Sequence, residues 1–377
     1  MTVSGSVSSN AQFRIGMGTL TLTNGADFRC YQEMLVADKM VAEMNYSAEP
    51  TNVTAIINVS SGCVLAAQAI TFGNGLNGNA TGILNQAGGL VRTTGTAAEG
   101  NGIRLGHYPA AYSVYNMMGG TLSVEKDWDL GCATDGTGWF NMTGGEVFTK
   151  RVMLNERDYD GGFGRLTVAG GTLNVGSLTG SSMAISNSIT ADLYARYLVE
   201  FGGAGGVVRA VTNLWIPASA TLIGTGTNAI TFDSQAWTIT MTNKLSGTGG
   251  LNKAGSGTLV LSGNNTYSGG TAVKEGTLVP AGRFALPNGA LTFGVAANGT
   301  CGVLHMTNDL SLTGLSVGVV NPEQLDKNQS YTVITYSGAL SGSLGSASLP
   351  KPWYVYYDWS GNTVQLRAGA GTKIWLK

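Results

Sequence analysis

Two carboxylates on one short segment are the first residues in this 377-residue chain whose types and spacing could do chemistry. Asp127 and Asp129 alternate along KDWDLG, so both are expected to face solvent if Trp128 and Leu130 point inward. A glycoside hydrolase needs such a pair, one acting as an acid and the other as a nucleophile or base. Outward charged residues are also ordinary on any strand, and that structural interpretation is favoured.

A second acidic group lies in the loop sequence NERDYDGG, which contains Glu156, Asp158 and Asp160. The DxD spacing of Asp158 and Asp160 offers oxygen ligands for Ca²⁺, although the EF-hand loop pattern is absent. A solvated turn is favoured over the calcium site, and catalysis is the weakest alternative. Lys150-Arg151, just before this loop, is the nearest approach to the base of a polysaccharide lyase. No catalytic residue, cofactor or further metal site is predicted.

Aromatic residues near the same loops suggest carbohydrate binding, because aromatic rings can stack on sugars. The candidate ligand contacts are His107, Tyr108, Trp139, Glu156, Asp158, Tyr159 and Asp160, and Tyr112 and Phe163 lie close to them in the sequence. The structural alternative is that each aromatic ring covers the end of an apolar core and that His107 is an exposed loop residue. His305 is expected to be structural. The sequence has no GxSxG, HExxH or P-loop motif.

Composition limits the function classes. Glycine accounts for 57 residues, charged residues for 11%, and the net charge is −1, which argues against nucleic-acid binding. No run of about 18 apolar residues indicates a membrane-spanning helix. Four cysteines lack CxxC spacing, so buried single thiols are favoured over metal binding, with a Cys30–Cys63 bridge as an alternative. The start lacks a signal-peptide pattern, so we expect either that one was removed or that the chain is a piece of a longer surface protein.

A repeat is visible once variable loops are set aside. Seven strand-like blocks end at doublets whose second residues are Gly25, Gly62, Gly89, Gly120, Gly145, Gly171 and Gly206. Each block continues with a second strand and a short third segment, such as MLVADKM, WDLGCA or SLTGSS. Three short strands per coil predict the cross-section of a parallel β-helix, whose coils bury their inward residues by stacking.

Insertions follow the third segment in nearly every block. They cover residues 37–50, 73–82, 106–111, 132–138, 155–162 and 180–196, and they carry much of the scarce charge. Insertions at one repeat position align along one edge of a solenoid, so this edge is the predicted contact surface. Short helices over residues 28–46 and 183–197 are a less favoured alternative.

Residues 247–279, GTGGLNKAGSGTLVLSGNNTYSGGTAVKEGTLV, closely resemble the autotransporter-associated β-strand repeat of bacterial secreted passenger domains. The core pattern GxGTLxLSGxNTYSGGT is nearly unbroken, and the resemblance extends weakly over the tail. It implies a right-handed parallel β-helix outside a bacterium and no particular activity. Trp353, Tyr354, Tyr356, Tyr357 and Trp359 crowd one strand of the tail, which predicts an aromatic cap over the last coil.

The sequence therefore predicts one all-β, single-stranded right-handed β-helix with edge insertions and a C-terminal cap. Its expected parts are coils over residues 1–219, a continuation with the recognised repeat over 220–320, and terminal strands over 321–377. The predicted role is that of a non-enzymatic, adhesin-type element at the cell surface or outside the cell, self-associating into fibres or layers. The alternative is a β-helix that binds or cleaves polysaccharide with its insertion edge. The expected partners are a second copy, a glycan or a host-surface ligand.

Overall fold

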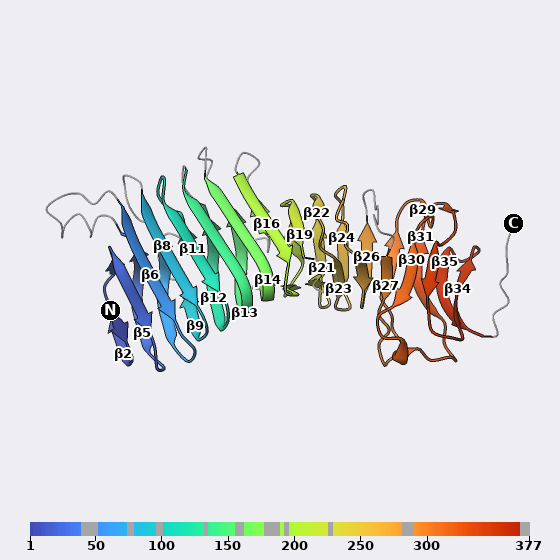
Figure 1. Cartoon of the computed structure of the whole chain (residues 1–377), viewed down its shortest axis with the longest axis horizontal. Helices are drawn as coiled ribbons and strands as arrows, with labels where there is room; N and C mark the ends of the chain where they lie inside the picture. The colour runs from blue at the N-terminus through green and yellow to red at the C-terminus, as the bar shows by residue number, and fades with distance from the viewer. Residues whose placement is uncertain are drawn as a thin grey trace.

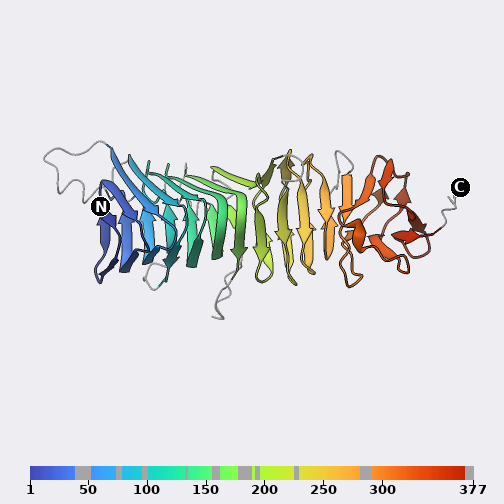
Figure 2. The same ribbon diagram turned by 60° about the horizontal axis from the view of Figure 1, so that its bottom comes forward.

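The computed structural model describes residues 1–38, 52–73, 79–95, 101–131, 135–154, 162–176, 189–191, 196–224, 229–280 and 290–369. These residues form a parallel β-helix, as predicted. The strands lie across an elongated rod, with β2 near one end and β34 near the other (Figure 1). The same stacking is visible after rotation about the long axis (Figure 2). Every ladder along the rod is parallel until the C-terminal strands.

Each N-terminal coil has three faces, and several strands continue around a corner to serve two of them. The first face contains β1 (Thr2–Val3), β4 (Gly18–Leu22), β6 (Val53–Val59), β8 (Ala80–Gln86), β11 (Tyr112–Met117), the starts of β13 (Thr137–Leu154) and β14 (Phe163–Val175), β16 (Arg196–Gly202), β19 (Ala220–Ile223) and β22 (Leu245–Gly247).

The second face follows the glycine turns. It contains β2 (Ser6–Ser9), the starts of β5 (Asp27–Val36), β7 (Val64–Phe72) and β12 (Thr121–Leu130), β9 (Leu90–Thr93), later parts of β13 and β14, β17 (Val207–Ala210), β20 (Ile230–Asp233), β23 (Leu251–Ala254), β25 (Thr271–Val273), β27 (Ala290–Phe293), β30 (Ser316–Val319) and β33 (Ser346–Ser348).

The third face completes each coil. It contains β3 (Phe13–Ile15), the ends of β5, β7, β12 and β13, β10 (Asn101–Leu105), β15 (Ile189–Ala191), β18 (Leu214–Ile216), β21 (Thr238–Met241), β24 (Thr258–Leu261), β26 (Thr277–Pro280), β28 (Val303–Met306) and β31 (Tyr331–Tyr336). The short strands β29 (Leu310–Ser311) and β32 (Leu340–Ser341) pair with each other, and a 3₁₀ turn covers Pro322–Gln324.

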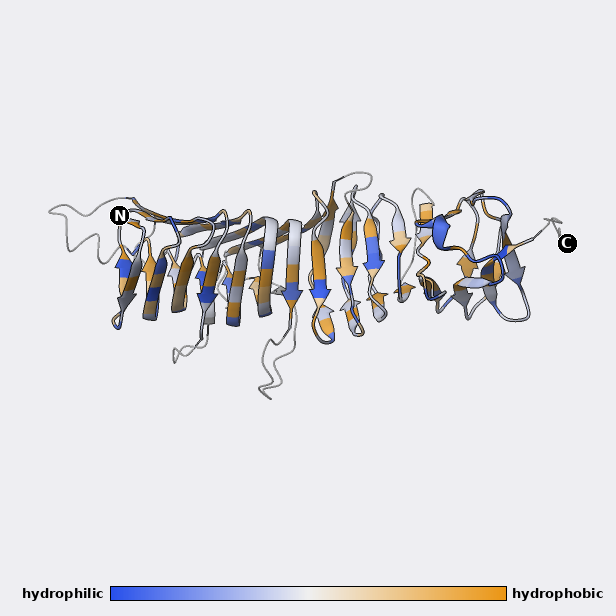
Figure 3. Cartoon of the chain, turned by 90° about the horizontal axis from the view of Figure 1, so that it is seen from below, coloured by the Kyte–Doolittle hydropathy of each residue, from blue (hydrophilic) through white to orange (hydrophobic). Residues whose placement is uncertain are grey.

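The core lies along the rod axis and is one continuous cluster from Val3 to Leu366. In β6, for example, Val53, Ala55, Ile57 and Val59 are buried, and the residues between them face outward. Hydrophobic and hydrophilic residues alternate along many strands in the view of Figure 3. The period of two in each strand therefore fills the interior, since successive side chains of a strand point to opposite faces.

The glycine doublets turn the chain from the first face to the second. The second residue has a positive φ in six blocks, with values between 70° and 82° from Gly25 to Gly171. A Cβ on Gly145 would lie 2.6 Å from the carbonyl oxygen of Gly120, and one on Gly120 would lie 2.4 Å from that of Gly89. These turns stack directly on one another, so they need glycine both for its left-handed backbone and for space. In the seventh block the turn uses Gly205, with φ 84°, instead of Gly206.

Five of the six predicted insertions begin where a third-face strand ends, along one edge of the rod. The third-face strands end in register at Val36, Phe72, Leu105, Leu130, Leu154 and Ala191. The predicted third segment SLTGSS lies outside the described residues, and the described strand that pairs with Val152–Leu154 is Ile189–Ala191. The insertion predicted over residues 180–196 therefore contains a strand of the coil.

Two of the less favoured alternatives, the short helices and the Cys30–Cys63 bridge, are wrong where the structure describes them. Residues 28–36 belong to β5, and residues 189–191 and 196–197 belong to β15 and β16, so no helix forms there. The alternating burial of Phe28 and Cys30 has the period of a strand. The Cys30–Cys63 bridge is also absent, because Cys30 stacks on Ala67 and both thiols are free and buried.

The rod ends where strand direction reverses. β35 (Thr363–Ala368) pairs antiparallel with β31, and β34 (Trp353–Asp358) pairs antiparallel with β35. Trp353 is buried against Tyr331, with ring centroids 5.6 Å apart, whereas Trp359 stacks on Tyr357 and is exposed. The predicted aromatic cap is thus a small antiparallel sheet that covers the last coil.

Candidate functional site

The outward side of the first face, from β4 to β13, forms the most regular surface of the described rod. We call it the outer strip. It consists of Thr19, Thr21, Thr54, Ile56, Asn58, Thr81, Ile83, Asn85, Tyr112, Val114, Asn116, Thr137, Trp139 and Asn141. Register pairing places these residues in three parallel rows along the rod. Tyr112 is the one residue among them with an ionisable side chain, so the strip is uncharged at neutral pH.

One row is an asparagine ladder. The Nδ2 atoms of Asn85, Asn116 and Asn141 each donate a hydrogen bond of 3.0 Å to the Oδ1 of the asparagine in the preceding coil. Asn58 donates at 3.5 Å to the hydroxyl of Thr21. All these side chains are half-buried, so the ladder fixes a line of amide groups at the protein surface.

The sequence predicted a row of stacked Asn, Thr and Val on the outward faces, but the individual asparagines of this ladder were not identified, although a signal for them was present. In four consecutive blocks the asparagine lies four residues before the second glycine of the turn, as Asn116 does before Gly120. Thr21 and Thr167 occupy the same position in flanking blocks. Alignment of the blocks on the turn glycine places these side chains in one row.

Aromatic rings lie next to the ladder. Trp139 and Tyr112 come from adjacent coils and pack edge to face, with centroids 5.2 Å apart. The guanidinium of Arg165, on the next coil, lies 5.3 Å from the Trp139 ring centre. Partial burial raises the pKa of Tyr112, and the charge of Arg165 acts in the opposite direction. Of the predicted ligand contacts, Trp139 is therefore part of an ordered aromatic group.

The Arg165–Glu200 pair ends the uncharged strip. Arg165 donates to the Glu200 carboxylate at 2.7 and 3.1 Å, and Thr167 donates to the same oxygen at 3.2 Å. Glu200 holds the guanidinium beside the indole of Trp139. The pair had not been identified from the sequence, because Arg165 and Glu200 are 35 residues apart and meet through coil stacking.

His107 and Tyr108 lie in the turn between β10 and β11. Their rings pack edge to face at 4.8 Å, both side chains are half-buried, and the backbone N–H of His107 donates to the Phe72 carbonyl. This turn leads directly into Tyr112, so it lies at the edge where the outer strip begins. The predicted contacts Glu156, Asp158, Tyr159 and Asp160 lie outside the described residues, and so does the candidate calcium site formed by Asp158 and Asp160.

The proposed carboxylate pair is not a solvent-facing pair. Asp129 is fully buried, contrary to expectation, whereas Trp128 and Leu130 point into the core as predicted. The Asp127 carboxylate forms an ion pair with Arg151, its register partner on the next coil. Asp127 came from the predicted hydrolase pair and Arg151 from the predicted lyase pair. The two side chains instead form one structural ion pair between adjacent coils.

The recognised repeat is held together by inward polar groups. Asn265 is buried, accepts from the Leu245 N–H at 2.9 Å and donates to the Gly263 carbonyl at 2.9 Å. The buried Tyr267 hydroxyl bonds the Thr271 hydroxyl at 2.7 Å, and burial raises its pKa to about 12. These bonds close the turn that replaces a first-face strand in this coil.

Lys253 is a second buried group of the repeat. Its ammonium donates to the carbonyls of Ala254, Gly255 and Glu275 at 2.8, 2.6 and 3.0 Å. Burial lowers the pKa of Lys253 to about 8, against the opposing charges of Glu275 and Asp233. The lysine therefore joins two adjacent coils from the inside. His305 is likewise bonded, with Nδ1 2.7 Å from the Thr335 hydroxyl, which fits its expected structural role.

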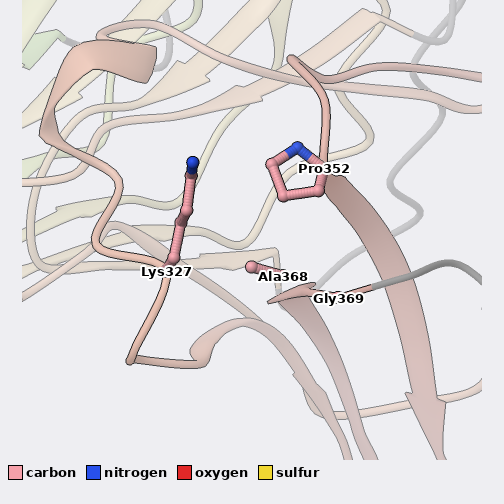
Figure 4. A pocket seen from close by; sticks show the side chains of 4 residues that line it. All are labelled: Lys327, Pro352, Ala368 and Gly369. Atoms are coloured by element: carbon pink, nitrogen blue, oxygen red, sulfur yellow. The ribbon is translucent and has the colours of Figure 1, made fainter.

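A pocket of about 440 Å³ lies at the C-terminal end, beside the cap. Its lining residues are Lys327 in the loop before β31, Pro352 just before β34, Ala368 at the end of β35 and Gly369 just after it (Figure 4). Lys327 supplies the one ionisable side chain among these four. In the part of the chain that the structure describes, no cluster of potential metal ligands and no helix long enough to cross a bilayer were found.

The fold and the outer strip define a class of protein: an extended β-solenoid that presents a regular surface. The passenger-associated-transport-repeat family matches residues 251–279. The chain is also 34% identical over 157 residues, 41% of its length, to the adhesin BmaC autotransporter of Brucella suis biovar 1 (strain 1330). It is 58% identical over 43 residues, 11% of its length, to the extracellular serine protease of Serratia marcescens. No solved structure matches the chain.

The chain spans 4% of the length of each of these two relatives. Together the matches support an autotransporter passenger-type repeat protein, as the sequence resemblance implied. The predicted surface or extracellular location is also confirmed, because one relative is an autotransporter adhesin and the other an extracellular protein.

Proposed function

We propose that the chain is a non-enzymatic segment of a surface adhesin, and that its outer strip binds glycans. The arrangement of Tyr112 and Trp139 beside the asparagine ladder is the observation that supports this proposal most strongly. An aromatic face packs against the C–H face of a sugar, while amides bond its hydroxyl groups. This combination supports a binding surface on a face of the rod next to the insertion edge that the sequence indicated.

Two observations favour binding over catalysis. Asp127 is neutralised by Arg151, and Asp129 is buried, so this pair lacks the solvent-facing geometry of a hydrolase. The similarity to a serine protease covers 43 residues, whereas the similarity to the adhesin covers 157. The expected result is that glycans bind without release of reducing ends.

A glycan array with matched variants tests the proposal. Trp139→Ala removes the half-buried ring next to the ladder and should weaken binding of the best glycan at least about tenfold, equivalent to about 1.4 kcal/mol. Trp215→Ala is the control, because Trp215 is 46% exposed but lies on the third face. Equal binding by wild type and Trp139→Ala would overturn the location of the site. A reducing-end assay on the same glycans tests the absence of cleavage.

Self-association into fibres or layers stays a prediction. The coil ladders expose strand edges at the ends of any solenoid, and such edges favour further pairing. Sedimentation velocity of the purified chain over a range of concentrations checks it, and a single monomeric species at all concentrations would contradict it.

A further inference from the structure

The asparagine ladder leaves half of its hydrogen-bonding capacity unused by the ladder itself. Within the ladder, Asn85 and Asn116 each donate one N–H and accept one bond at Oδ1. A side-chain amide has two N–H groups and two acceptor positions, so Asn85 and Asn116 each retain one N–H donor and one acceptor position for another partner. The bonds within the ladder also hold every amide in one orientation. A ligand would therefore meet donors and acceptors that are already ordered.

These groups recur at the spacing of the coils. Adjacent strands of a sheet lie about 4.8 Å apart, so the four steps from Thr21 to Asn141 cover about 19 Å along the rod. Tyr112 and Trp139 lie on the last two of these coils. A single sugar would touch one or two amides, whereas an extended chain would meet one from each coil.

The strip also favours an uncharged ligand. From β4 to β13 its outward residues are threonine, asparagine, aliphatic and aromatic, and the Arg165–Glu200 ion pair begins one coil beyond Trp139. An acidic polymer would find no cation along the ladder, and at its end it would compete with Glu200 for Arg165. A peptide strand has no free ladder edge to join here, because the strands from β6 to β13 pair on both sides.

We propose that the outer strip binds a linear neutral polysaccharide that lies along the rod axis. Sugar rings stack on Tyr112 and Trp139, and hydroxyl groups of successive residues bond the amides of Asn116, Asn85 and Asn58. This inference rests on the proposed glycan-binding function and adds the ligand class and its direction. Because each coil adds one contact, affinity grows with the length of the glycan until the strip is filled.

Calorimetric titration with neutral oligosaccharides of increasing length, from the cellulose and chitin series, tests this proposal. Affinity for the wild type should rise with length and then level off. Asn116→Ala interrupts the ladder and should weaken binding of the longest oligosaccharide about two- to tenfold, the value of one or two hydrogen bonds. In the same variant, the affinity for the shortest oligosaccharide that still binds at Trp139 should change less. Asn252→Ala is the matched control, because Asn252 bonds Thr231 on the second face, outside the strip.

The outcomes separate the inference from the proposed function. If Trp139→Ala abolishes binding but affinity is independent of length and Asn116→Ala equals Asn252→Ala, the strip binds a short glycan and the axial arrangement is wrong. If an acidic polysaccharide of equal length binds as tightly as the neutral one, the ligand class is wrong. If no glycan binds, and Trp139→Ala abolishes dimerisation of the chain instead, the strip is an interface between copies and both proposals fail.

Discussion

The wide coils before residue 224 and the narrow coils of the recognised repeat solve the same stacking problem in different ways. In the wide coils, Val114, Trp139 and Arg165 stack in register at steps of 25 and 26 residues, and three faces enclose the core. In the narrow coils, Ile230 and Leu251 stack at a step of 21 and Leu251 and Thr271 at a step of 20. There a turn replaces the first-face strand after β22.

Both regions bury polar residues, including Gln86 in the wide coils, whereas the asparagine ladder belongs to the outward side of the wide coils. The narrow coils bury Asn265, Tyr267 and Lys253. Asn265 and Lys253 bond backbone groups, and the Tyr267 hydroxyl bonds the hydroxyl of Thr271. The wide coils turn Asn85 and Asn116 outward, where they bond from coil to coil. The segment with the clearest sequence motif therefore uses it to close a coil, whereas the proposed ligand surface lies in coils that lack this motif.

Removing a buried ring of the narrow coils should have the largest effect. Tyr267→Ala deletes a fully buried side chain and its bond to Thr271, so we expect a loss of about 3–5 kcal/mol in unfolding free energy. Tyr112→Ala, on the outer strip, should cost much less because its ring is half-buried. Urea unfolding of both variants measures the difference. Equal losses would show that the inward motif does not dominate the stability of its coil.

The stacked glycine turns of the wide coils should be the next most sensitive. Gly145→Ala places a Cβ 2.6 Å from the Gly120 carbonyl oxygen at a φ of 82°, and should cost about 2–3 kcal/mol from left-handed strain and crowding. Gly25→Ala has a similar φ of 73°, but no atom within 4 Å of the new Cβ. Its cost should be limited to about 1 kcal/mol. Thermal unfolding checks the order, and a reversed order would refute the stacked-turn explanation.

Lys253 should give the narrow coils a distinct dependence on pH. Burial lowers the pKa of Lys253 from its ordinary value of 10.5 to about 8 in the folded chain. Between these two pH values the unfolded chain therefore binds more protons than the folded chain does. The contribution of Lys253 to unfolding free energy therefore rises from pH 8 toward pH 10 and is lost as pH falls through 8. Above pH 10 the buried Tyr267, with a pKa of about 12, acts in the opposite direction, because the unfolded tyrosine ionises first.

Lys253→Met should remove that rise and cost about 1–3 kcal/mol at pH 7, since three backbone carbonyls lose their donor. Lys274→Met, at an exposed lysine of the same repeat, should change neither quantity. Denaturation curves at pH 7, 8, 9 and 10 compare the two variants. If the unfolding free energy of Lys253→Met still rises with pH, another titrating group causes the rise.

The smallest effect on stability is expected at the ladder. Asn116→Ala removes the bonds to Asn85 and from Asn141, yet these amides can bond water instead, so the loss should be about 1 kcal/mol or less. Hydrogen exchange of β8, β11 and β13 should change little. A loss as large as that of Tyr267→Ala would mean that the outer ladder holds the wide coils together, as the inner groups hold the narrow ones.

Much of the fold could be predicted from the sequence because it depends on local patterns. The recurring doublets marked the turns at Gly120 and Gly145, and the alternation of apolar residues marked the strands around them. Prediction was incomplete where two local patterns competed. The segment SLTGSS looked like a strand and lies outside the described residues, and only the pairing of β15 with Val152–Leu154 shows which described segment belongs to the coil.

The candidate site was predictable in part. Trp139 was identified as an aromatic residue near the insertion edge, and it lies on the outer strip. Tyr112 was noted near the same edge, whereas Arg165 and Glu200 were not identified as neighbours of Trp139, because they come from two other coils. Asp129 was misplaced for a related reason: alternation assigned it to the outward side, but the outward side of a solenoid strand is not everywhere exposed.

The sequence by itself determined that this chain winds into a β-solenoid, since glycine turns and the two-residue period of apolar side chains act over a few residues. The tertiary structure alone decided which residues meet between coils, because loops of unequal length separate them along the chain. Register therefore created the asparagine ladder, the aromatic pair and the Asp127–Arg151 contact, none of which is local in sequence.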